Sequence, residues 1–375
     1  MTAKILVVGG GIAGLTAATA LAQAGNSVDL VEQNPQLGDL GGVGLTLVGN
    51  AMAALAKIGV AEECVAHGMP ADTLTMRRAT GEEIVKSPLP RIGGPDWPGA
   101  TGIRRSILHA ILVDAARKAG VSIQCNATVD HWHDTDAGVN VAVTAGGGLH
   151  HYDLLVGADG LYSDLRKRLL PDSTPQFSGQ SIWRAEAPRP HNLQTTEIYL
   201  GGRHGVVGTC PVSADLCYFY IVQADLARTR RNPAKLHEQM AAELEGYGGL
   251  IPELVRTLDR PEKVSFRPLD WIIAPRPWGR GRTILIGDAV HANPPVLAQG
   301  AAMAIEDAVV LADELRRADG QIDDALRKFV DRRFDRAAAV VHASCELARA
   351  EVEQRHDLDV LAIMRKSTMQ LAEPC

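Results

Sequence analysis

The sequence predicts an α/β fold in which a parallel sheet, built from both ends of the chain, is interrupted by a β-rich insertion. An apolar strand runs directly into a glycine-rich turn and a helix over residues 4–24. A second strand of this kind, residues 283–286, ends in Gly287-Asp288. Between them, residues 178–225 alternate apolar and polar side chains with period two, which is typical of antiparallel strands with one covered face.

The first strand leads into Gly9-x-Gly11-x-x-Gly14, and the next strand ends at Glu32. The first glycine allows a tight turn, the second lets the backbone approach a pyrophosphate, and the third lets helix and strand pack closely. The helix predicted over residues 12–24 points its free N–H groups at the phosphates, and Glu32 can accept hydrogen bonds from ribose hydroxyls. Together these features indicate a Rossmann-like unit that binds a dinucleotide. A purely structural glycine turn is the alternative.

The composition is that of a globular protein with a substantial core, because 46% of the 375 residues are hydrophobic. No apolar run approaches the roughly 18 residues of a membrane span. The net charge of -6 comes without a basic stripe, which argues against nucleic acid as a partner. The six cysteines contain no CxxC pair, which favours free thiols over a disulfide framework or a metal site. We therefore expect a cytoplasmic protein without metal, and no signal peptide fits before the first strand.

The remaining elements are predicted from periodicity and turn composition. In order, they are a helix near residues 50–58, a hairpin within 72–85, a Pro- and Gly-rich loop over 88–102, a helix near 105–119, short strands up to residue 160, the β-rich region, two helical segments, and long helices over 299–317 and 322–351. This order implies a discontinuous nucleotide-binding domain of residues 1–71, 100–172 and 268–320, a β-rich substrate domain of residues 72–99 and 173–267, and C-terminal helices over 321–375. The substrate would lie at the seam.

Three motifs occur in a fixed order: the glycine fingerprint, GADGLYSDLR at residues 157–166, and GDAVHANPPVLAQGAAMAIEDA at residues 287–308. In this arrangement the chain resembles the group A FAD-dependent aromatic hydroxylases, the family of p-hydroxybenzoate hydroxylase and salicylate hydroxylase, over residues 5–340. The resemblance implies an FAD-binding domain, with NADH or NADPH as a transient electron donor. It also implies O₂ and a small aromatic or N-heteroaromatic substrate, hydroxylated through a flavin hydroperoxide.

The resemblance also implies cofactor contacts. Asp159 would lie beside the pyrophosphate, and Asp288 would accept a hydrogen bond from a ribitol hydroxyl; for both, a helix or turn cap is the alternative. Arg105, or Arg104 if the register differs by one, would hold the diphosphate. The backbone N–H groups of residues 298–302 would face the flavin pyrimidine. The further positions expected at the cofactor are Ala13, Gln33, Val43, Gly44, Val129, Pro295, Ala298, Gln299, Gly300, Ala301 and Ala302.

Three substrate-side positions follow from the same resemblance. Thr46, Arg184 and His204 match positions that face the substrate in some relatives, including hydroxylases of urate and hydroxynicotinate. The structural alternatives are a β-branched strand residue without function for Thr46, an ion-paired strand residue for Arg184 and a turn residue for His204. An anionic substrate would pair with Arg184, and His204 is the candidate base. Pro295 is a candidate catalytic position, because a backbone carbonyl of the rigid proline pair would lie beside the flavin ring.

Four further residues are assigned less specific roles. We expect Tyr199, Tyr218 and Tyr220 to be core residues with a polar hydroxyl, and they are secondary candidates for contact with the substrate. His291 is expected to be structural. The alternatives to a hydroxylase are a flavin-binding sequestration or sensor protein without turnover, and an FAD-dependent reductase or epoxidase on the same scaffold. The C-terminal helices carry apolar stripes that could cover the core or the partner in a homodimer.

Overall fold

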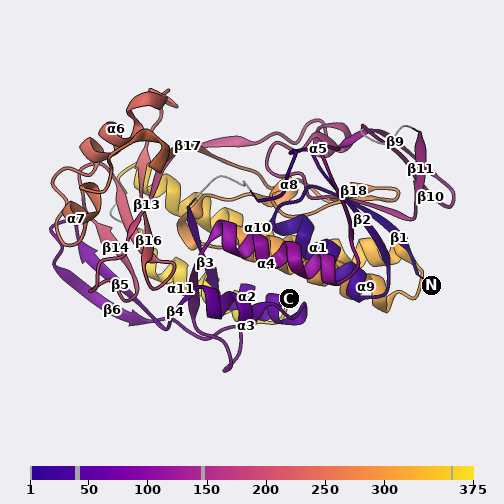
Figure 1. Ribbon diagram of the computed structural model, residues 1–375, viewed down its shortest axis with the longest axis horizontal. Helices are drawn as coiled ribbons and strands as arrows, with labels where there is room; N and C mark the ends of the chain where they lie inside the picture. Colours follow the sequence, from indigo (N-terminus) through magenta and orange to yellow (C-terminus); the bar gives the residue numbers. More distant parts are fainter. Residues whose placement is uncertain (1, 39–42, 145–147, 356–357) are drawn as a thin grey trace.

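Two large sheets lie at opposite ends of the molecule, and long helices run between them (Figure 1). The computed structural model describes residues 2–38, 43–144, 148–355 and 358–375. The six-stranded sheet lies toward the N-terminus, and the seven-stranded sheet lies at the far end of the long axis. Helix α10 (Ile322–Val352) packs both on α9 (Gly300–Arg317), beside the first sheet, and on strand β13 (Gln176–Pro188) of the second. It therefore connects the two halves.

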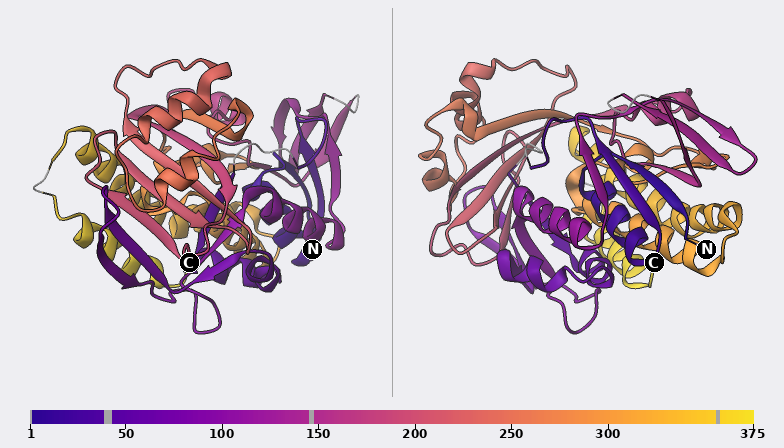
Figure 2. Two further views of the ribbon diagram at one scale, coloured as in Figure 1. Left: turned by 60° about the vertical axis from the view of Figure 1, so that its left-hand side comes forward. Right: turned by 45° about the vertical axis from the view of Figure 1, so that its right-hand side comes forward.

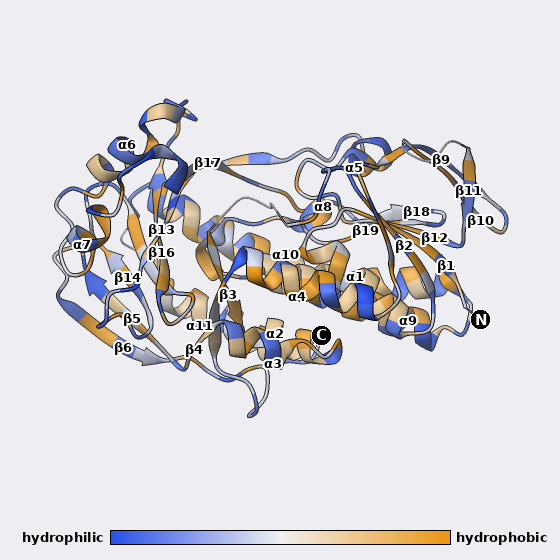
Figure 3. Cartoon of the chain, viewed as in Figure 1, coloured by the Kyte–Doolittle hydropathy of each residue, from blue (hydrophilic) through white to orange (hydrophobic). Residues whose placement is uncertain are grey.

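The six-stranded sheet has the strand order β18-β19-β12-β1-β2-β8 and is parallel except at its β18 edge. Its strands are β1 (Lys4–Val8), β2 (Ser27–Glu32), β8 (Ser122–Cys125), β12 (Leu154–Gly157), β18 (Gly279–Arg280) and β19 (Thr283–Leu285). The central strands are apolar and buried, as expected for parallel strands covered on both faces (Figure 3). This confirms the predicted Rossmann-like sheet, to which both ends of the chain contribute.

Helices and a small sheet cover this parallel sheet. α1 (Ile12–Gln23) packs against α9 and against α4 (Arg105–Lys118). The antiparallel strands β9 (Val129–Thr135), β10 (Gly138–Val143) and β11 (Leu149–Tyr152) form a separate sheet, which contacts β1 and β12. One continuous apolar core joins these layers.

The seven-stranded sheet has the order β17-β13-β16-β15-β14-β5-β6. Its other strands are β5 (Thr73–Arg78), β6 (Glu83–Pro88), β14 (Thr196–Leu200), β15 (Val206–Pro211), β16 (Leu216–Ala224) and β17 (Val264–Trp271). The predicted hairpin is confirmed as β5 and β6, and it joins this sheet through a parallel pairing of β5 with β14. Helices α6 (Leu236–Glu243) and α7 (Ile251–Val255) lie against the same sheet (Figure 2).

The two faces of the seven-stranded sheet have different neighbours. Trp183 and Phe219 belong to the buried cluster that includes side chains of α6 and α7, so their face is the helix-covered, outer one. Because successive side chains of a strand alternate between faces, Arg184 and Tyr220 lie on the opposite, inner face. This inner face turns toward strand β3 (Gly44–Val48), since Cys210 on it contacts Thr46.

The remaining elements connect the two halves. They are β3 (Gly44–Val48), β4 (Met69–Ala71) and β7 (Ala100–Arg104), which form a three-stranded sheet, and the helices α2 (Gly49–Lys57), α3 (Ala61–His67), α5 (Asp164–Leu169), α8 (Asp288–His291) and α11 (Val360–Ala372). Short 3₁₀ turns lie at Pro233–Lys235, Pro261–Lys263 and Pro295–Leu297. The predicted helices near 50–58, 105–119, 299–317 and 322–351 are confirmed as α2, α4, α9 and α10. Among the described residues, no helix is long and apolar enough to span a membrane.

Candidate active site

The loop between β1 and α1 has the geometry that the glycine fingerprint predicts. Gly9 has a φ of 108°, and a Cβ there would lie 2.4 Å from the Ala158 carbonyl oxygen. A Cβ on Gly14 would lie 1.8 Å from the Gly9 carbonyl oxygen, whereas a Cβ on Gly11 would meet no atom within 4 Å. No side chain caps α1. Gly9 and Gly14 therefore serve the protein's own packing, while Gly11 borders open space at a helix N-terminus that suits a phosphate.

The Glu32 carboxylate fastens this loop to the end of β2. Its Oε2 accepts the backbone N–H of Gly10 at 2.6 Å, and its Oε1 accepts from the backbone and side chain of Asn34 at 2.8 and 2.6 Å. Each carboxylate oxygen has more than one lone pair, so ribose hydroxyls can still be accepted. Gln33, which follows directly, is exposed.

His109 is a second side chain that holds the β1–α1 loop in place, and the sequence analysis did not identify it. Its Nε2 lies 2.8 Å from the Gly10 carbonyl oxygen. Because a carbonyl only accepts, Nε2 must carry the proton. Burial is the main cause that lowers the pKa of His109. The available signal was its position four residues after Arg105, which places both side chains on one face of α4.

Asp288 and Arg105 lie close enough for their charges to interact. Both side chains keep solvent-accessible surface. Even so, burial among protein atoms raises the pKa of Asp288 and lowers the pKa of Arg105, with the charge of each residue acting on the other. Neither side chain makes a hydrogen bond or ion pair with another described residue, so both remain available to a ligand.

Arg104 resolves the register question. Its Nε lies 2.9 Å from Glu186 Oε2, so this guanidinium already has a partner. Arg105 is the residue of the two that is left for a diphosphate. The Arg105 backbone N–H donates to the Val43 carbonyl at 3.3 Å, which brings the start of β3 beside it.

Asp159 partly caps a helix and keeps one oxygen free. Its Oδ2 accepts the Leu165 backbone N–H at 3.1 Å, while Ser163 is the N-cap residue of α5. Oδ1 is buried and has no hydrogen-bond partner among the described residues. Burial is the largest cause that raises the pKa of Asp159. The capping role and an unused acceptor beside the Gly9 turn therefore coexist in one side chain.

The segment before α9 leaves several backbone N–H groups without helical partners. Ala298 has a φ of 53° and donates its N–H to the Pro295 carbonyl at 3.0 Å. α9 then starts at Gly300 without a side-chain cap, so the first N–H groups of the helix, at Gly300 to Ala302, lack helical partners. Such a terminus favours negative charge.

Charged side chains buried beneath this segment hold it in place. His291 Nε2 lies 2.5 Å from Asp307 Oδ2, which also accepts the Gly287 N–H at 2.8 Å. Arg333 donates to Asp307 at 2.7 Å and to Glu306 at 2.5 Å. All four of these side chains are at most 1% exposed. His291 thus lies in a structural network between α8, α9 and α10.

The inner face of the seven-stranded sheet carries the substrate-side residues. Arg184 on β13 lies opposite Tyr220 on β16, and Tyr220 lies opposite Gly208 on β15. A Cβ on Gly208 would lie 2.2 Å from Cζ of Tyr220, so the phenol ring crosses over β15. Tyr218, one row further, stacks with Tyr220 at 5.8 Å between ring centroids. These rings form an aromatic platform beside Arg184.

Arg184 has no hydrogen bond or ion pair with any described residue. Burial lowers its pKa, and the positive charges of Arg105 and Arg267 lower it further. An unpaired guanidinium in a desolvated place is a strong site for an anionic group. Thr46 lies against the same face of the sheet, with Oγ1 3.6 Å from Cys210 Sγ.

His204 does not join this group, which corrects its expected role as the base. Its Nδ1 lies 3.1 Å from Glu243 Oε2 on α6. The same carboxylate binds Arg231, whose guanidinium lies over the Trp183 ring. Trp183 belongs to the helix-covered face, so His204 is held on the side of the sheet opposite to Arg184. Tyr199, a secondary candidate for substrate contact, is also fully buried in that outer cluster.

Four of the other expected positions lie against neighbouring elements. A Cβ on Gly44 would lie 2.3 Å from Tyr218 Cδ1, so close packing requires glycine there. A Cβ on Gly287 would lie 3.0 Å from Ala13 Cβ, which puts Ala13 beside the start of α8. Val129 is buried at the start of β9. Gln299 bonds Asn50 of α2 at 3.1 Å.

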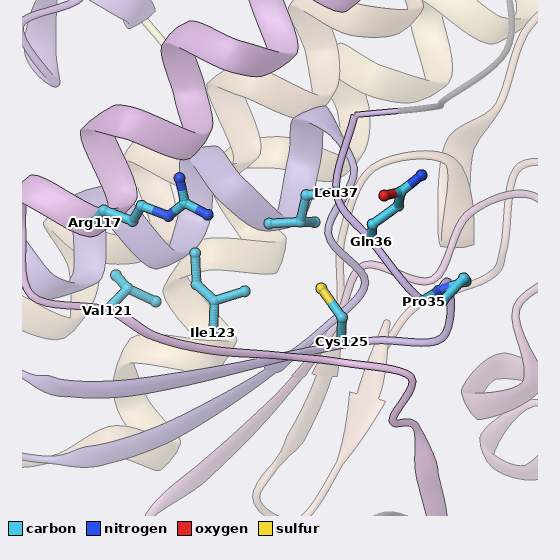
Figure 4. A pocket seen from close by; sticks show the side chains of 7 residues that line it. All are labelled: Pro35, Gln36, Leu37, Arg117, Val121, Ile123 and Cys125. Atoms are coloured by element: carbon cyan, nitrogen blue, oxygen red, sulfur yellow. The ribbon is translucent and has the colours of Figure 1, made fainter.

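A separate groove of about 490 Å³ flanks the Glu32 end of the site. It lies between α4, β8 and the loop after β2 (Figure 4). Its lining residues are Pro35, Gln36, Leu37, Arg117, Val121, Ile123 and Cys125. None of the residues expected at the substrate lines it.

Comparison with known proteins identifies the family and the fold. A family model described as FAD binding domain matches residues 2–344. The 3-hydroxybenzoate 6-hydroxylase 1 of Aquipseudomonas alcaligenes is 32% identical, over 90% of this chain and 86% of that protein. The 6-hydroxynicotinate 3-monooxygenase of Bordetella bronchiseptica is 30% identical, over 91% and 90%. The crystal structure of Klebsiella pneumoniae HpxO with FAD and uric acid has a TM-score of 0.84 at 25% identity, covering 99% of this chain and 93% of that chain.

Proposed function

The chain belongs to the group A FAD-dependent aromatic hydroxylases, and from this premise we propose that it is a single-component monooxygenase acting on an anionic aromatic or N-heteroaromatic ring. NADH or NADPH is the electron donor and O₂ the co-substrate. The observation that carries the proposal is the unpaired Arg184 beside the Tyr220 ring, close enough to Arg105 to sense its charge, as Arg105 senses that of Asp288. None of these three charged side chains has a hydrogen bond or ion pair with another described residue.

Residues suited to each part of FAD, from the ribose to the pyrimidine ring, are present. Glu32 binds the ribose, the α1 N-terminus at Gly11 and the Arg105 guanidinium bind the diphosphate, and Asp288 accepts from the ribitol chain. The N–H groups at the start of α9 face the pyrimidine. When bound and reduced, FAD supplies the oxygen-transfer chemistry of the reaction. The spare Asp159 oxygen and the open space at Gly11 support this placement, since both leave room or bonding capacity for a ligand.

The substrate lies on the aromatic platform. Arg184 holds its anionic group through charge-assisted hydrogen bonds, and Tyr218 and Tyr220 contact the flat ring. This arrangement excludes water from the reacting edge, which oxygen transfer to a ring requires. Two relatives act, by name, on hydroxylated rings that carry a carboxylate, which supports the same substrate class here.

The test is a screen of purified, FAD-loaded protein. We would measure NADH and NADPH oxidation with 3-hydroxybenzoate, 6-hydroxynicotinate and uric acid, and determine product mass under ¹⁸O₂. A stimulated rate with one labelled oxygen in the product is expected. Arg184→Met should raise KM for the active probe at least about tenfold, since a hydrogen bond to a charged group contributes about 1.5–3 kcal/mol. The exposed Arg230, changed to Met, is the matched control. No stimulation by any ring compound would overturn the proposal.

A further inference from the structure

The last turn of α10 places one carboxyl group at the substrate platform without a cation beside it. α10 ends at Val352 against β13 and β16, where Figure 1 shows it reaching the seven-stranded sheet. Glu351 Oε2 accepts from Gln180 Nε2 at 2.7 Å, and the Val206 backbone N–H is directed at the same carboxyl. Glu351 Oε1 is buried and has no hydrogen-bond partner among the described residues.

The sheet register fixes where this carboxyl lies relative to the platform. Val206 is opposite Val222, and the next row on the same face pairs Gly208 with Tyr220. The two rows are separated by two residues along β15, which corresponds to about 7 Å. Because the Tyr220 ring crosses over Gly208, its hydroxyl ends about one row from the Glu351 carboxyl. A single ligand atom between the Tyr220 hydroxyl and the Glu351 carboxyl, with a hydrogen bond of about 2.8 Å to each, would span most of the distance between these two groups.

The titratable groups around Glu351 provide no compensating charge. Tyr220 on β16 and Tyr247 beyond α6 both sense its charge, and the pKa of each is raised by burial. Arg184 on β13 is four residues along the strand from Gln180, and no ion pair to Glu351 occurs among the described residues. The carboxyl also sits at a helix C-terminus, where the helix dipole disfavours negative charge. Burial raises the pKa of Glu351 to about 7.

We propose that Glu351 is the proton acceptor of the reaction, with the ring hydroxyl or ring N–H of the substrate lying between the Tyr220 hydroxyl and the Glu351 carboxyl. This rests on the proposed function. The O–H or N–H bond of the ring breaks, its proton forms the O–H of the Glu351 carboxyl, and the electron pair stays on the ring. The ring becomes more electron-rich, as attack on oxygen requires, and the proton later leaves to solvent.

Two features make Glu351 suited to this task. The residue keeps some accessible surface, and its terminal torsion is soft, so a small rotation presents Oε1 to a ligand. A base is most effective when its pKa is near the operating pH. His204 is held on the opposite face of the sheet by Glu243, away from the platform.

The experiment compares the FAD-loaded wild type with Glu351→Gln, Glu351→Asp and the exposed Glu346→Gln as matched control. We would measure kcat/KM with whichever of 3-hydroxybenzoate, 6-hydroxynicotinate and uric acid is turned over, from about pH 5.5 to pH 9. The wild type should gain activity with rising pH and level off above about pH 7. Glu351→Gln should lose at least about 100-fold at neutral pH, the low end for general-base catalysis, and recover as the probe ionises by itself in solution.

The outcomes separate the two proposals. Glu351→Asp should restore part of the rate together with a pH-dependent limb, which a purely structural role does not predict. An active wild type whose pH profile is unchanged in Glu351→Gln, at normal FAD absorbance, overturns the inference and leaves the proposed function standing. A wild type with FAD that binds and oxidises none of the probes overturns both.

Discussion

Gly11→Ala should abolish tight FAD binding without damaging the protein. An added Cβ meets no protein atom within 4 Å, and Gly11 has φ -80° and ψ -174°, which alanine adopts readily. Replacing a glycine at a compatible conformation stabilises a protein by about 0.4–1 kcal/mol through the unfolded state. The apo-protein should therefore melt at the same temperature as the wild type, or slightly above it.

Gly11→Ala should weaken only the binding of FAD. The Cβ occupies the space through which the diphosphate approaches the α1 N-terminus, so at least one charge-assisted hydrogen bond is lost. At about 1.5–3 kcal/mol for such a bond, the Kd for FAD rises about 10- to 150-fold. Flavin fluorescence titration of apo-protein measures it.

Gly14→Ala is the matched comparison. Its Cβ would lie 1.8 Å from the Gly9 carbonyl oxygen, so the fold itself should lose stability and the melting temperature should fall. If Gly11→Ala binds FAD as tightly as the wild type, the diphosphate does not pass this turn, and the placement of the cofactor is refuted.

Three further outcomes are expected. Asp288→Ala should give colourless or easily bleached protein, because the ribitol loses its acceptor; tightly held flavin, seen by absorbance after gel filtration, would contradict this. Arg333→Met should cost up to about 3–5 kcal/mol in urea denaturation, because two buried carboxylates lose the cation that they share and keep only Arg336 and His291 as partners; an unchanged midpoint would contradict that. The raised pKa of Glu351 means that ionisation above the unfolded value costs stability, so Glu351→Gln should gain up to about 3 kcal/mol over the wild type between about pH 5 and pH 8. Equal pH dependence in urea titrations of the two proteins would exclude this.

The FAD-binding half could be predicted in detail because local rules determine it. The glycine fingerprint, the strand that ends at Glu32 and the motif around Asp288 each depend on a short run of residues whose backbone geometry follows from residue type. Arg105 could be placed at a helix start for the same reason. The structure adds the choice between Arg104 and Arg105, which depends on an ion pair with Glu186, 82 residues away.

The substrate side could not be predicted from local pattern. Period-two alternation identified β15 and β16, but whether a residue faces the cofactor or α6 depends on sheet order and on which face the helices cover. His204 follows two glycines in a loop, and its pairing with Glu243 is a tertiary contact. Glu351 was hidden because it lies in a helix rich in Ala, Arg and Glu, where a solvated face is the ordinary interpretation of a glutamate. Only the packing of α10 on β13 distinguishes it.

The contrast between the fully buried Arg333 and the partly buried Arg184 supports the proposed position of the anionic group. Arg333, with no exposed surface, is matched by two carboxylates and a carbonyl, so the energy of removing its charge from water is largely recovered. Arg184 is desolvated as well, yet it has no acceptor among the described residues and lies close enough to Arg105 and Arg267 to be repelled by them. A fold retains such an unpaired charge at a cost of several kcal/mol, and an anion that binds there removes that cost. The cost of leaving the Arg184 guanidinium unpaired is therefore recovered when an anion binds. For this reason the anionic group of the substrate, rather than its ring, should dominate KM.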